Sequence, residues 1–480
     1  MRVQSSLHTL LRVVVATSCL VVANPISTRW TIGQSITTTS GPVGGHAASG
    51  ADQVSEYLGI PYAQPPVGIL RFQPPVKYNG SSPISGSAFP SSAPVSLEAV
   101  KQLGVPASAA DVTKALADTG PQSEDCLTLN VWTKPQTGDA KKAVLVWVHG
   151  GAFVTAYNGK FIADQDDVVV VSMNYRLNIF GFPGNPVAAP NLGFLDIRMA
   201  MEWVRNNVEK FGGDDHHVWP VGRGSLVDYY SYAYAADPIA NGFIPMSGVA
   251  NGFGIYTNQT VNQKWFQISS LVGCGSNLTD PNAVSDCMSE KNATELIASL
   301  ANTTSAVSTG LSFAPVVDDR LIFADYGIRN SAKAGYLIGN AENEAGLFKI
   351  GAPSLNETYW FGFNLVAYTC PPREGRHEQC LLATRPGDTL PVLFDTVPQT
   401  AIKSTSQEIA VGKYMRGAWA AFAKDTTSGL LNYNCHGTWP TYRIEGTTLN
   451  RISFENETGT DLAPGDSYDG LCAQVGIPIA

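Results

Sequence analysis

The sequence has few basic residues, and long hydrophobic runs are lacking beyond its first two dozen residues. Its 31 Lys and Arg are outnumbered by 40 Asp and Glu, and no cluster of Lys or Arg occurs. This balance argues against nucleic acid or an anionic membrane surface as a partner. No segment after residue 23 is long and apolar enough for a transmembrane helix. No metal-ligand spacing and no phosphate-binding glycine loop are present, so we expect neither a metal nor a cofactor.

The first 23 residues have the pattern of a secretory signal peptide. Arg2 and Arg12 flank an apolar stretch over residues 13–22, which ends at the small residue Ala23. A buried N-terminal helix is the alternative. Cleavage would remove two basic and no acidic residues and take the net charge from −9 to −11. The sequence therefore predicts a secreted, soluble protein whose mature chain is residues 24–480.

Cysteines and glycosylation sequons fit an extracellular protein. Seven cysteines remain after residue 23, and close spacing favours the pairs Cys274–Cys287 and Cys370–Cys380. Cys435 and Cys472 form the remaining pair, and Cys126 is predicted to be a free, buried thiol. Seven Asn-x-Ser/Thr sequons predict N-glycosylation, at Asn79, Asn258, Asn277, Asn292, Asn302, Asn356 and Asn456.

Short apolar runs alternate with helical patterns along the chain, which predicts a mostly parallel sheet with helices on both faces. The clearest helix is 194–210, where Ile197, Met201, Val204 and Val208 recur at helical spacing. Asn191 precedes it as a start signal, and glycines follow it. The strand candidates are 144–148, 168–172, 218–221, 243–246 and 336–338. No internal repeat is present, and we predict one α/β domain over residues 24–480.

Several motifs occur in one order along the chain. They include Tyr-Leu-Gly-Ile-Pro-Tyr-Ala-Gln-Pro-Pro at 57–66, Glu-Asp-Cys-Leu-Thr-Leu-Asn-Val at 124–131 and His-Gly-Gly-Ala-Phe at 149–153. Asn-Tyr-Arg at 174–176 and Phe-Gly-Gly-Asp at 211–214 follow. Together they resemble the type-B carboxylesterase/lipase family, which includes the cholinesterases and secreted fungal esterases. The resemblance implies an α/β-hydrolase fold and hydrolysis of carboxylic esters through an acyl-serine.

Two parts of the family's catalytic machinery have matching positions. Gly150 and Gly151 match the oxyanion loop, where glycine lets backbone N–H groups approach a developing alkoxide. A tight strand-to-loop turn is the alternative there. Glu344 matches the acid of the triad, with a surface carboxylate as the alternative. His149 precedes the glycines and is expected to be structural.

The nucleophile does not have its family position. The family ends a strand in Gly-x-Ser-x-Gly, but here the chain reads Gly222-Arg223-Gly224-Ser225. Counted from Gly222, the serine position is Gly224. When the family pattern is aligned backwards from Val227 instead, about three residues of the pattern are missing from this chain, and the serine is one of them. Ser225 is the only nearby hydroxyl; it matches an oxyanion donor and is expected in the first turn of a helix. We expect Gly224 to have a positive φ.

The general base is missing as well. The stretch 385–394 matches the family segment that carries the triad histidine, with Pro386 in its place. Proline has no titratable group and cannot move a proton. After Glu344 only His377 and His436 remain, each a candidate for a displaced base. Without histidine, Glu344 would need another partner, such as Ser247 or Arg223.

Three hypotheses follow. The chain is a degenerate esterase that binds a small ester, another apolar ligand or a protein partner. Alternatively, it is an active hydrolase that uses Ser225 with His377 or His436. The third is that the sequence is mis-assembled and omits two short in-frame segments of an otherwise intact family member. Loss of both nucleophile and base predicts ester turnover that is weak or absent.

Overall fold

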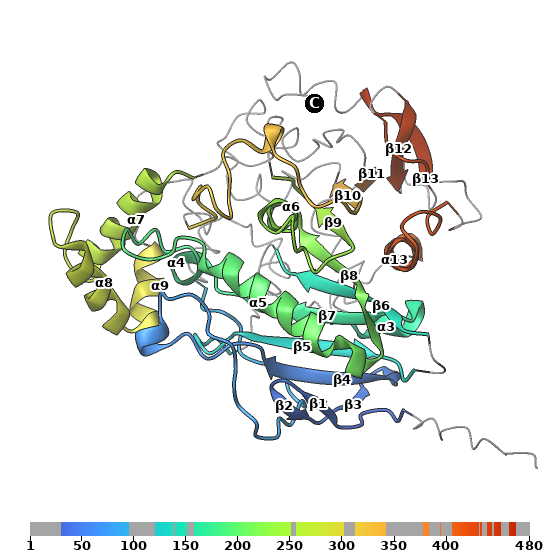
Figure 1. Ribbon diagram of the computed structural model, residues 1–480, viewed down its shortest axis with the longest axis horizontal. Helices are drawn as coiled ribbons and strands as arrows, with labels where there is room; N and C mark the ends of the chain where they lie inside the picture. The colour runs from blue at the N-terminus through green and yellow to red at the C-terminus, as the bar shows by residue number, and fades with distance from the viewer. Residues whose placement is uncertain are drawn as a thin grey trace, which may run out of the picture.

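The computed structural model describes residues 30–95, 121–136, 140–150, 158–250, 256–301, 313–341 and 406–431, together with shorter pieces within 138–466. Figure 1 shows a twisted sheet through the middle of the molecule with helices on both sides. This arrangement confirms the predicted α/β-hydrolase class with a mostly parallel sheet. The elements keep the labels of Figure 1 throughout.

In the described part of the chain, eleven strands form the large sheet, in the order β13-β12-β11-β10-β9-β8-β6-β7-β5-β4-β3. Every pairing from β7 through β6, β8, β9, β10 and β11 to β12 is parallel, and the pairings at both ends are antiparallel. Their bounds are β3 (His46–Ala48), β4 (Ala51–Pro61), β5 (Thr128–Thr133), β6 (Lys142–Val148), β7 (Val169–Met173), β8 (Gly213–Arg223), β9 (Gly242–Met246), β10 (Gly335–Ala341), β11 (Glu378–Ala383), β12 (Thr447–Ile452) and β13 (Thr460–Pro464). A separate hairpin pairs β1 (Ile36–Thr38) with β2 (Gly41–Val43).

Strand β6 explains how the two faces of the sheet are buried. Side chains alternate between the faces of a strand, and the alternate residues Val144, Val146 and Val148 belong to one buried cluster. Leu145 and Trp147 belong to the other. Because helices cover both faces, the strand is apolar from Ala143 to Val148, as expected for a buried parallel strand.

The helices form two layers. The helices are α3 (Lys160–Asp166), α4 (Asn178–Gly181), α5 (Leu192–Asn207), α6 (Gly224–Ala233), α7 (Asn258–Leu271), α8 (Pro281–Glu290), α9 (Ala293–Ala301) and α13 (Ser406–Lys424). Short 3-10 turns occur at η1 (Gly68–Leu70), η3 (Val208–Phe211) and η4 (Tyr326–Ile328). Helices α5 and α6 contribute to the core on the Val146 side, and α3 and α13 contribute to the core on the Leu145 side.

The predicted helix 194–210 corresponds to α5 followed by η3. Its predicted apolar face is buried, from Ile197 to Val208. Asn191 precedes the helix as expected, but its side chain does not cap it. Instead, its amide nitrogen donates to the Val316 carbonyl at 2.8 Å and its amide oxygen accepts from the Val316 N–H at 2.9 Å. Asn191 therefore ties the helix to a distant segment.

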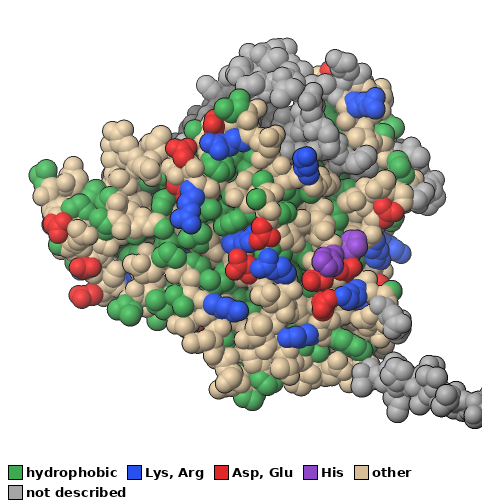
Figure 2. Space-filling model, in the orientation of Figure 1, with side chains coloured by type: hydrophobic (Ala, Val, Ile, Leu, Met, Phe, Trp, Pro, Cys, Tyr) green, Lys and Arg blue, Asp and Glu red, His purple; other side chains and the backbone are tan. Residues whose placement is uncertain are grey.

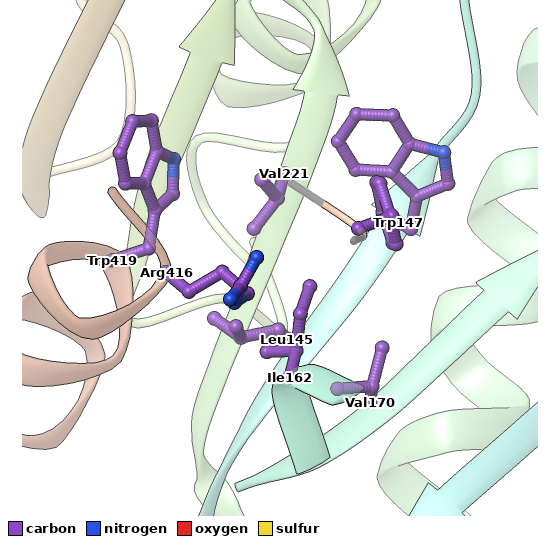
Figure 3. A pocket seen from close by; sticks show the side chains of 8 residues that line it. Leu145, Trp147, Ile162, Val170, Val221, Arg416 and Trp419 are labelled. Carbon is purple, nitrogen blue, oxygen red and sulfur yellow. The ribbon is translucent and has the colours of Figure 1, made fainter. Parts of the chain in front are cut away.

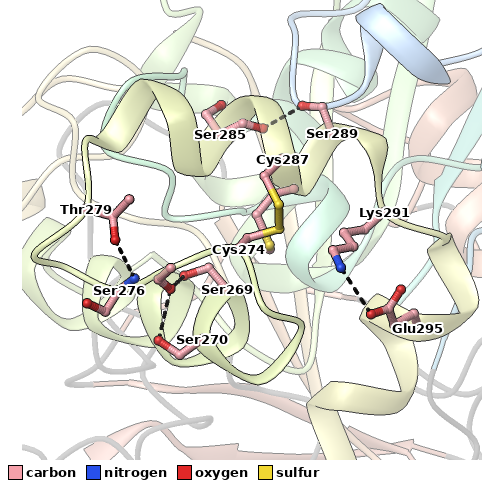
Figure 4. Close-up of a disulfide and its surroundings, with 12 residues drawn as sticks. Ser269, Ser270, Cys274, Ser276, Thr279, Ser285, Cys287, Ser289, Lys291 and Glu295 are labelled. Carbon is pink, nitrogen blue, oxygen red and sulfur yellow. Dashed lines mark hydrogen bonds and ion pairs between the residues drawn. A yellow bond between two sulfur atoms is a disulfide. The ribbon is translucent and has the colours of Figure 1, made fainter.

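One predicted disulfide is present, and it closes the connection between α7 and α8. Cys274 and Cys287 are bonded, with Cα atoms 5.6 Å apart, and Figure 4 shows the bond that joins the loop after α7 to α8. Cys126 is a free cysteine and fully buried, as predicted. The partners Cys370, Cys435 and Cys472 lie outside the described residues, and only the backbone of Cys380 is described.

The described surface includes four of the sequon asparagines and a mixture of charged side chains. Four sequon asparagines are exposed, namely Asn79, Asn258, Asn277 and Asn292, while Asn302, Asn356 and Asn456 lie outside the described residues. On the face shown in Figure 2, acidic and basic side chains are interspersed. None of the helices in the described ranges is long and apolar enough to cross a membrane.

Candidate active site

The predicted site residues follow strands that end at one edge of the sheet. Gly150 lies two residues after β6, α6 begins directly after β8, and Ser247 follows β9. These strands are parallel, and the register pairs Val148 with Gly222 and Arg223 with Met246. In open α/β sheets, ligands bind outside the carboxyl ends of the strands. The edge that carries Gly150, Gly224 and Ser225 is therefore the candidate site.

The turn from β8 into α6 is extremely short. Gly222 has φ +125°, and a Cβ on it would lie 2.2 Å from the Val148 carbonyl oxygen. Only glycine fits here, because the turn has a positive φ and touches the backbone of β6. Arg223 is the last residue of β8 and Gly224 is already the first residue of α6. The positive φ predicted for Gly224 is wrong: the shortened turn moves it to Gly222.

Gly224 has no room for a side chain. A Cβ built there would lie 1.9 Å from the carbonyl oxygen of Gly248 and 2.8 Å from that of Met246. Real Cβ atoms do not approach backbone oxygens so closely, so any larger residue would have to push the segment after β9 away. The position that matches the family nucleophile is filled by backbone.

Ser225 lies in the first turn of α6 and is 8% exposed. No side-chain hydrogen bond joins Ser225 to another of the described residues. Backbone N–H groups of a first helical turn have no partner within the helix, so the Ser225 N–H is suited to bind an oxyanion at the sheet edge. The geometry therefore favours Ser225 as an oxyanion donor through its backbone N–H, and not as a nucleophile through its hydroxyl.

Each described histidine interacts with a residue other than Ser225. His149 is buried and stacks on Tyr175 with ring centroids 4.4 Å apart, and the Tyr175 hydroxyl donates to the His149 carbonyl oxygen at 2.5 Å. His217 bonds Asp214 at 2.7 Å near the amino end of β8, beside His216. His46 bonds Glu56 at 3.0 Å.

The other half of the predicted constellation cannot be placed. Gly151, Glu344, Pro386, His377 and His436 lie outside the described residues, as does the side chain of Arg223. Ser247 is described: it has φ +58°, and its N–H donates to the Gly339 carbonyl oxygen at 2.8 Å. Strand β10, which leads toward Glu344, is thereby held against the segment that follows β9.

Asp228 is a buried residue that the sequence interpretation missed. Its carboxylate accepts a hydrogen bond from the Ala250 N–H at 2.8 Å, and Ser231 donates to the Asp228 carbonyl oxygen at 2.7 Å. The carboxylate therefore ties α6 to the segment after β9, in which Gly248 lies. The available signal was an acidic residue in the apolar stretch Val227–Tyr232.

A buried ion pair supports the loop after β7. Arg176 and Asp196 form a two-bond pair, with Nε–Oδ2 at 2.8 Å and Nη2–Oδ1 at 2.7 Å. Burial acts to lower the pKa of Arg176, but the Asp196 carboxylate more than offsets this, so the pKa is raised. The backbone N–H of Arg176 also donates to Asp196, at 3.0 Å. Such planar pairs fix geometry as well as charge, and this one joins the Asn-Tyr-Arg motif to α5.

Within the described ranges, no group of His, Cys, Asp and Glu could hold a metal ion. What these residues offer chemically is backbone donors at a sheet edge and one buried hydroxyl.

Comparison with known proteins assigns the family. The model of the carboxylesterase family matches residues 33–358. The chain belongs to the carboxylesterase family. A chlorogenic acid esterase from Aspergillus niger is 31% identical over 86% of this chain and 87% of its own length. Secreted lipase 5 from Gibberella zeae is 32% identical over 64% of each chain. Acetylcholinesterase from Electrophorus electricus is 31% identical over 63% of this chain and 50% of its own length.

Membership in the carboxylesterase family associates this chain with ester hydrolysis in general and with small-molecule esters as ligands. It also confirms the α/β-hydrolase fold and the resemblance that the motifs indicated.

Proposed function

We propose that this chain is a secreted, N-glycosylated carboxylesterase-family protein with weak or absent ester hydrolysis. The single observation that carries this proposal is the elbow: Gly224 replaces the nucleophile, and the Gly248 carbonyl oxygen occupies the space of a side chain there. Pro386, in the position of the triad histidine, supports it from the sequence. The scaffold would then bind a small ester, another apolar ligand or a protein partner.

Activity is tested with purified protein and short-chain nitrophenyl esters, with chlorogenic acid as a second substrate. Losing the nucleophile or the base alone costs about 10⁶-fold in kcat in a serine protease, and losing both costs little more. We therefore expect ester turnover that is weak or absent. Turnover that Ser225→Ala abolishes would overturn the proposal.

An active hydrolase that uses Ser225 is the second candidate. It is favoured by the position of Ser225, a buried hydroxyl residue in the first turn of α6 at the carboxyl-end edge of the sheet. It requires a base, for which His377 and His436 are the candidates. Under this alternative, His377→Ala or His436→Ala would remove the activity together with Ser225→Ala.

Export and sequence integrity have direct tests. A relative named as a secreted lipase supports export, and the exposed sequon asparagines support glycosylation. We expect a culture-medium protein that begins near residue 24 and loses mass on treatment with an N-glycosidase.

Peptide masses of the natural protein across 211–232 and 370–394 should match the printed sequence. Longer peptides would show that the chain has an intact elbow and an intact segment for the catalytic base.

A further inference from the structure

Four Asn-Gly dipeptides occur in the sequence, and the fold holds the described ones differently. They begin at Asn79, Asn158, Asn241 and Asn251, and the last lies outside the described residues. Asparagine is a chemically labile residue. It is most labile before glycine, because no Cβ hinders the glycine nitrogen from reaching the preceding side chain. Exposure and hydrogen bonding then decide which pair reacts.

The Asn79–Gly80 pair lies outside the helices and strands. Asn79 is exposed and Gly80 is half-buried. The Asn79 amide oxygen accepts one long hydrogen bond, from the Gln64 side chain at 3.5 Å. No hydrogen bond joins the Gly80 N–H to another of the described residues. The atoms of this pair can therefore approach each other without breaking a strand or a helix.

The Asn241–Gly242 pair is fixed at the start of β9. The Val218 N–H donates to the Asn241 amide oxygen at 3.2 Å, and the Asn241 N–H donates to the Val218 carbonyl oxygen at 3.0 Å. Gly242 is buried in β9 and pairs with Gly335 of β10. Attack by the Gly242 nitrogen would have to disrupt the end of the strand.

The Asn158–Gly159 pair is fixed at the start of α3. The Asn158 amide oxygen accepts from the Lys160 N–H at 3.0 Å, and Gly159 is buried directly before the helix. Ile162 of α3 and Leu145 of β6 line one small cavity (Figure 3), so the first turn of the helix is packed against the sheet. This pair is held as firmly as the pair at β9.

We propose that Asn79 carries one of two mutually exclusive modifications: an N-glycan on its side-chain nitrogen or, on chains without that glycan, spontaneous deamidation. The Gly80 nitrogen attacks the Asn79 side-chain carbonyl carbon and forms a C–N bond. The side-chain nitrogen leaves as ammonia and takes the proton that the Gly80 nitrogen gives up. Water then opens the succinimide to aspartate or isoaspartate. A glycan on the leaving nitrogen blocks this reaction.

Deamidation at Asn79 has two consequences for the chain. Both products add a negative charge and destroy the Asn79-Gly80-Ser81 sequon irreversibly. The glycan half of the proposal rests on the export proposed above. The deamidation half depends neither on export nor on ester hydrolysis.

The test uses the full-length variant Ser81→Ala, which removes the sequon at an exposed residue and keeps the Asn-Gly pair. Purified variant and secreted wild type are aged in mildly alkaline buffer, and peptide masses report the exchange of NH for O. We expect Asn79 of Ser81→Ala to lose its amide at least about tenfold faster than Asn158 and Asn241, which must first break hydrogen bonds. Wild type should retain a glycan at Asn79. Its glycopeptide is measured intact, because enzymatic release would itself yield aspartate.

Two controls separate the fold from the dipeptide. Gly80→Ala added to Ser81→Ala should slow the loss, and the nearest atoms to its new Cβ belong to the ring of Tyr78, which can rotate away. In denaturant, the Asn79, Asn158 and Asn241 pairs should react at similar rates, because only the fold distinguishes them.

Three results would overturn the deamidation: an intact Asn79 in aged Ser81→Ala, equal rates at the three pairs in the folded variant, or no slowing by Gly80→Ala. Wild type that lacks the glycan and deamidates as fast as Ser81→Ala would support the deamidation and refute the glycan.

Discussion

The carbonyl oxygen of Gly248 lies 1.9 Å from the position that a Cβ on Gly224 would take. This contact couples two segments that border the candidate active site, the start of α6 and the turn after β9. It also means that the nucleophile position is closed by backbone, and that simple substitution will not reopen it.

Replacing Gly224 by serine should therefore fail to create an esterase. We expect Gly224→Ser to lower the free energy of unfolding by about 2 kcal/mol or more, because the new Cβ must displace the Gly248 carbonyl. Chemical denaturation measures the loss. Gly327→Ser is the matched control, since a Cβ there meets no atom within 4 Å. Nitrophenyl ester turnover by Gly224→Ser would show that the elbow can open.

Removing the disulfide should destabilise the α7–α8 connection. Cys274 and Cys287 are 13 residues apart in sequence, and a cross-link over a loop of this size stabilises by about 3 kcal/mol. We expect the double alanine variant to lose about this amount in a denaturant titration. Leu278→Ala, a change at a 92% exposed residue in the same loop, should leave stability unchanged. Equal stability of the double variant and the wild type would refute the estimate.

Asp166 should make stability depend on pH. Burial raises the pKa of its carboxyl to about 6, even though Arg416 and the lysines Lys424 and Lys413 act to lower it. The ordinary value in an unfolded chain is about 3.9, so the folded state binds the proton more tightly. Stability from this group is thus gained as pH falls through about 6 toward 4, and lost as pH rises.

Asp166→Asn removes this titration. We expect the variant to be more stable than the wild type by about 1–2 kcal/mol at pH 7.5, with the difference vanishing near pH 4. Denaturation at several pH values measures it. Asp286→Asn, at an exposed position on α8, controls for a general effect of charge. If the stability difference between Asp166→Asn and the wild type grew toward low pH, the raised pKa assigned to Asp166 would be wrong.

Local pattern predicted much of the architecture. The runs 144–148, 168–172, 218–221, 243–246 and 336–338 all lie in or overlap β6 to β10, because buried parallel strands are continuously apolar. The helix 194–210 was predictable because its apolar residues recur at helical spacing, and the Cys274–Cys287 pair because few residues separate the two cysteines.

Long-range contacts limited the prediction of the site. A positive φ was expected at Gly224 from the family pattern, but the shortened turn places it at Gly222, where β8 passes the Val148 carbonyl. Asn191 was expected to cap α5, yet it bonds Val316, which is 125 residues away. The role of Asp228 depends on Ala250, and neither its position in the sequence nor its residue type indicates that partner.

Covalent labelling with a serine-directed phosphonate tests the central claim most directly. The probe is incubated with the purified protein, with Ser225→Ala, and with an active serine esterase as positive control, and adducts are located by peptide mass spectrometry. We predict no adduct on this chain, because Gly224 leaves the elbow without a nucleophile and the Ser225 hydroxyl has no histidine partner among the described residues. Stoichiometric labelling at Ser225 that is lost in Ser225→Ala would contradict the account and establish an active serine hydrolase.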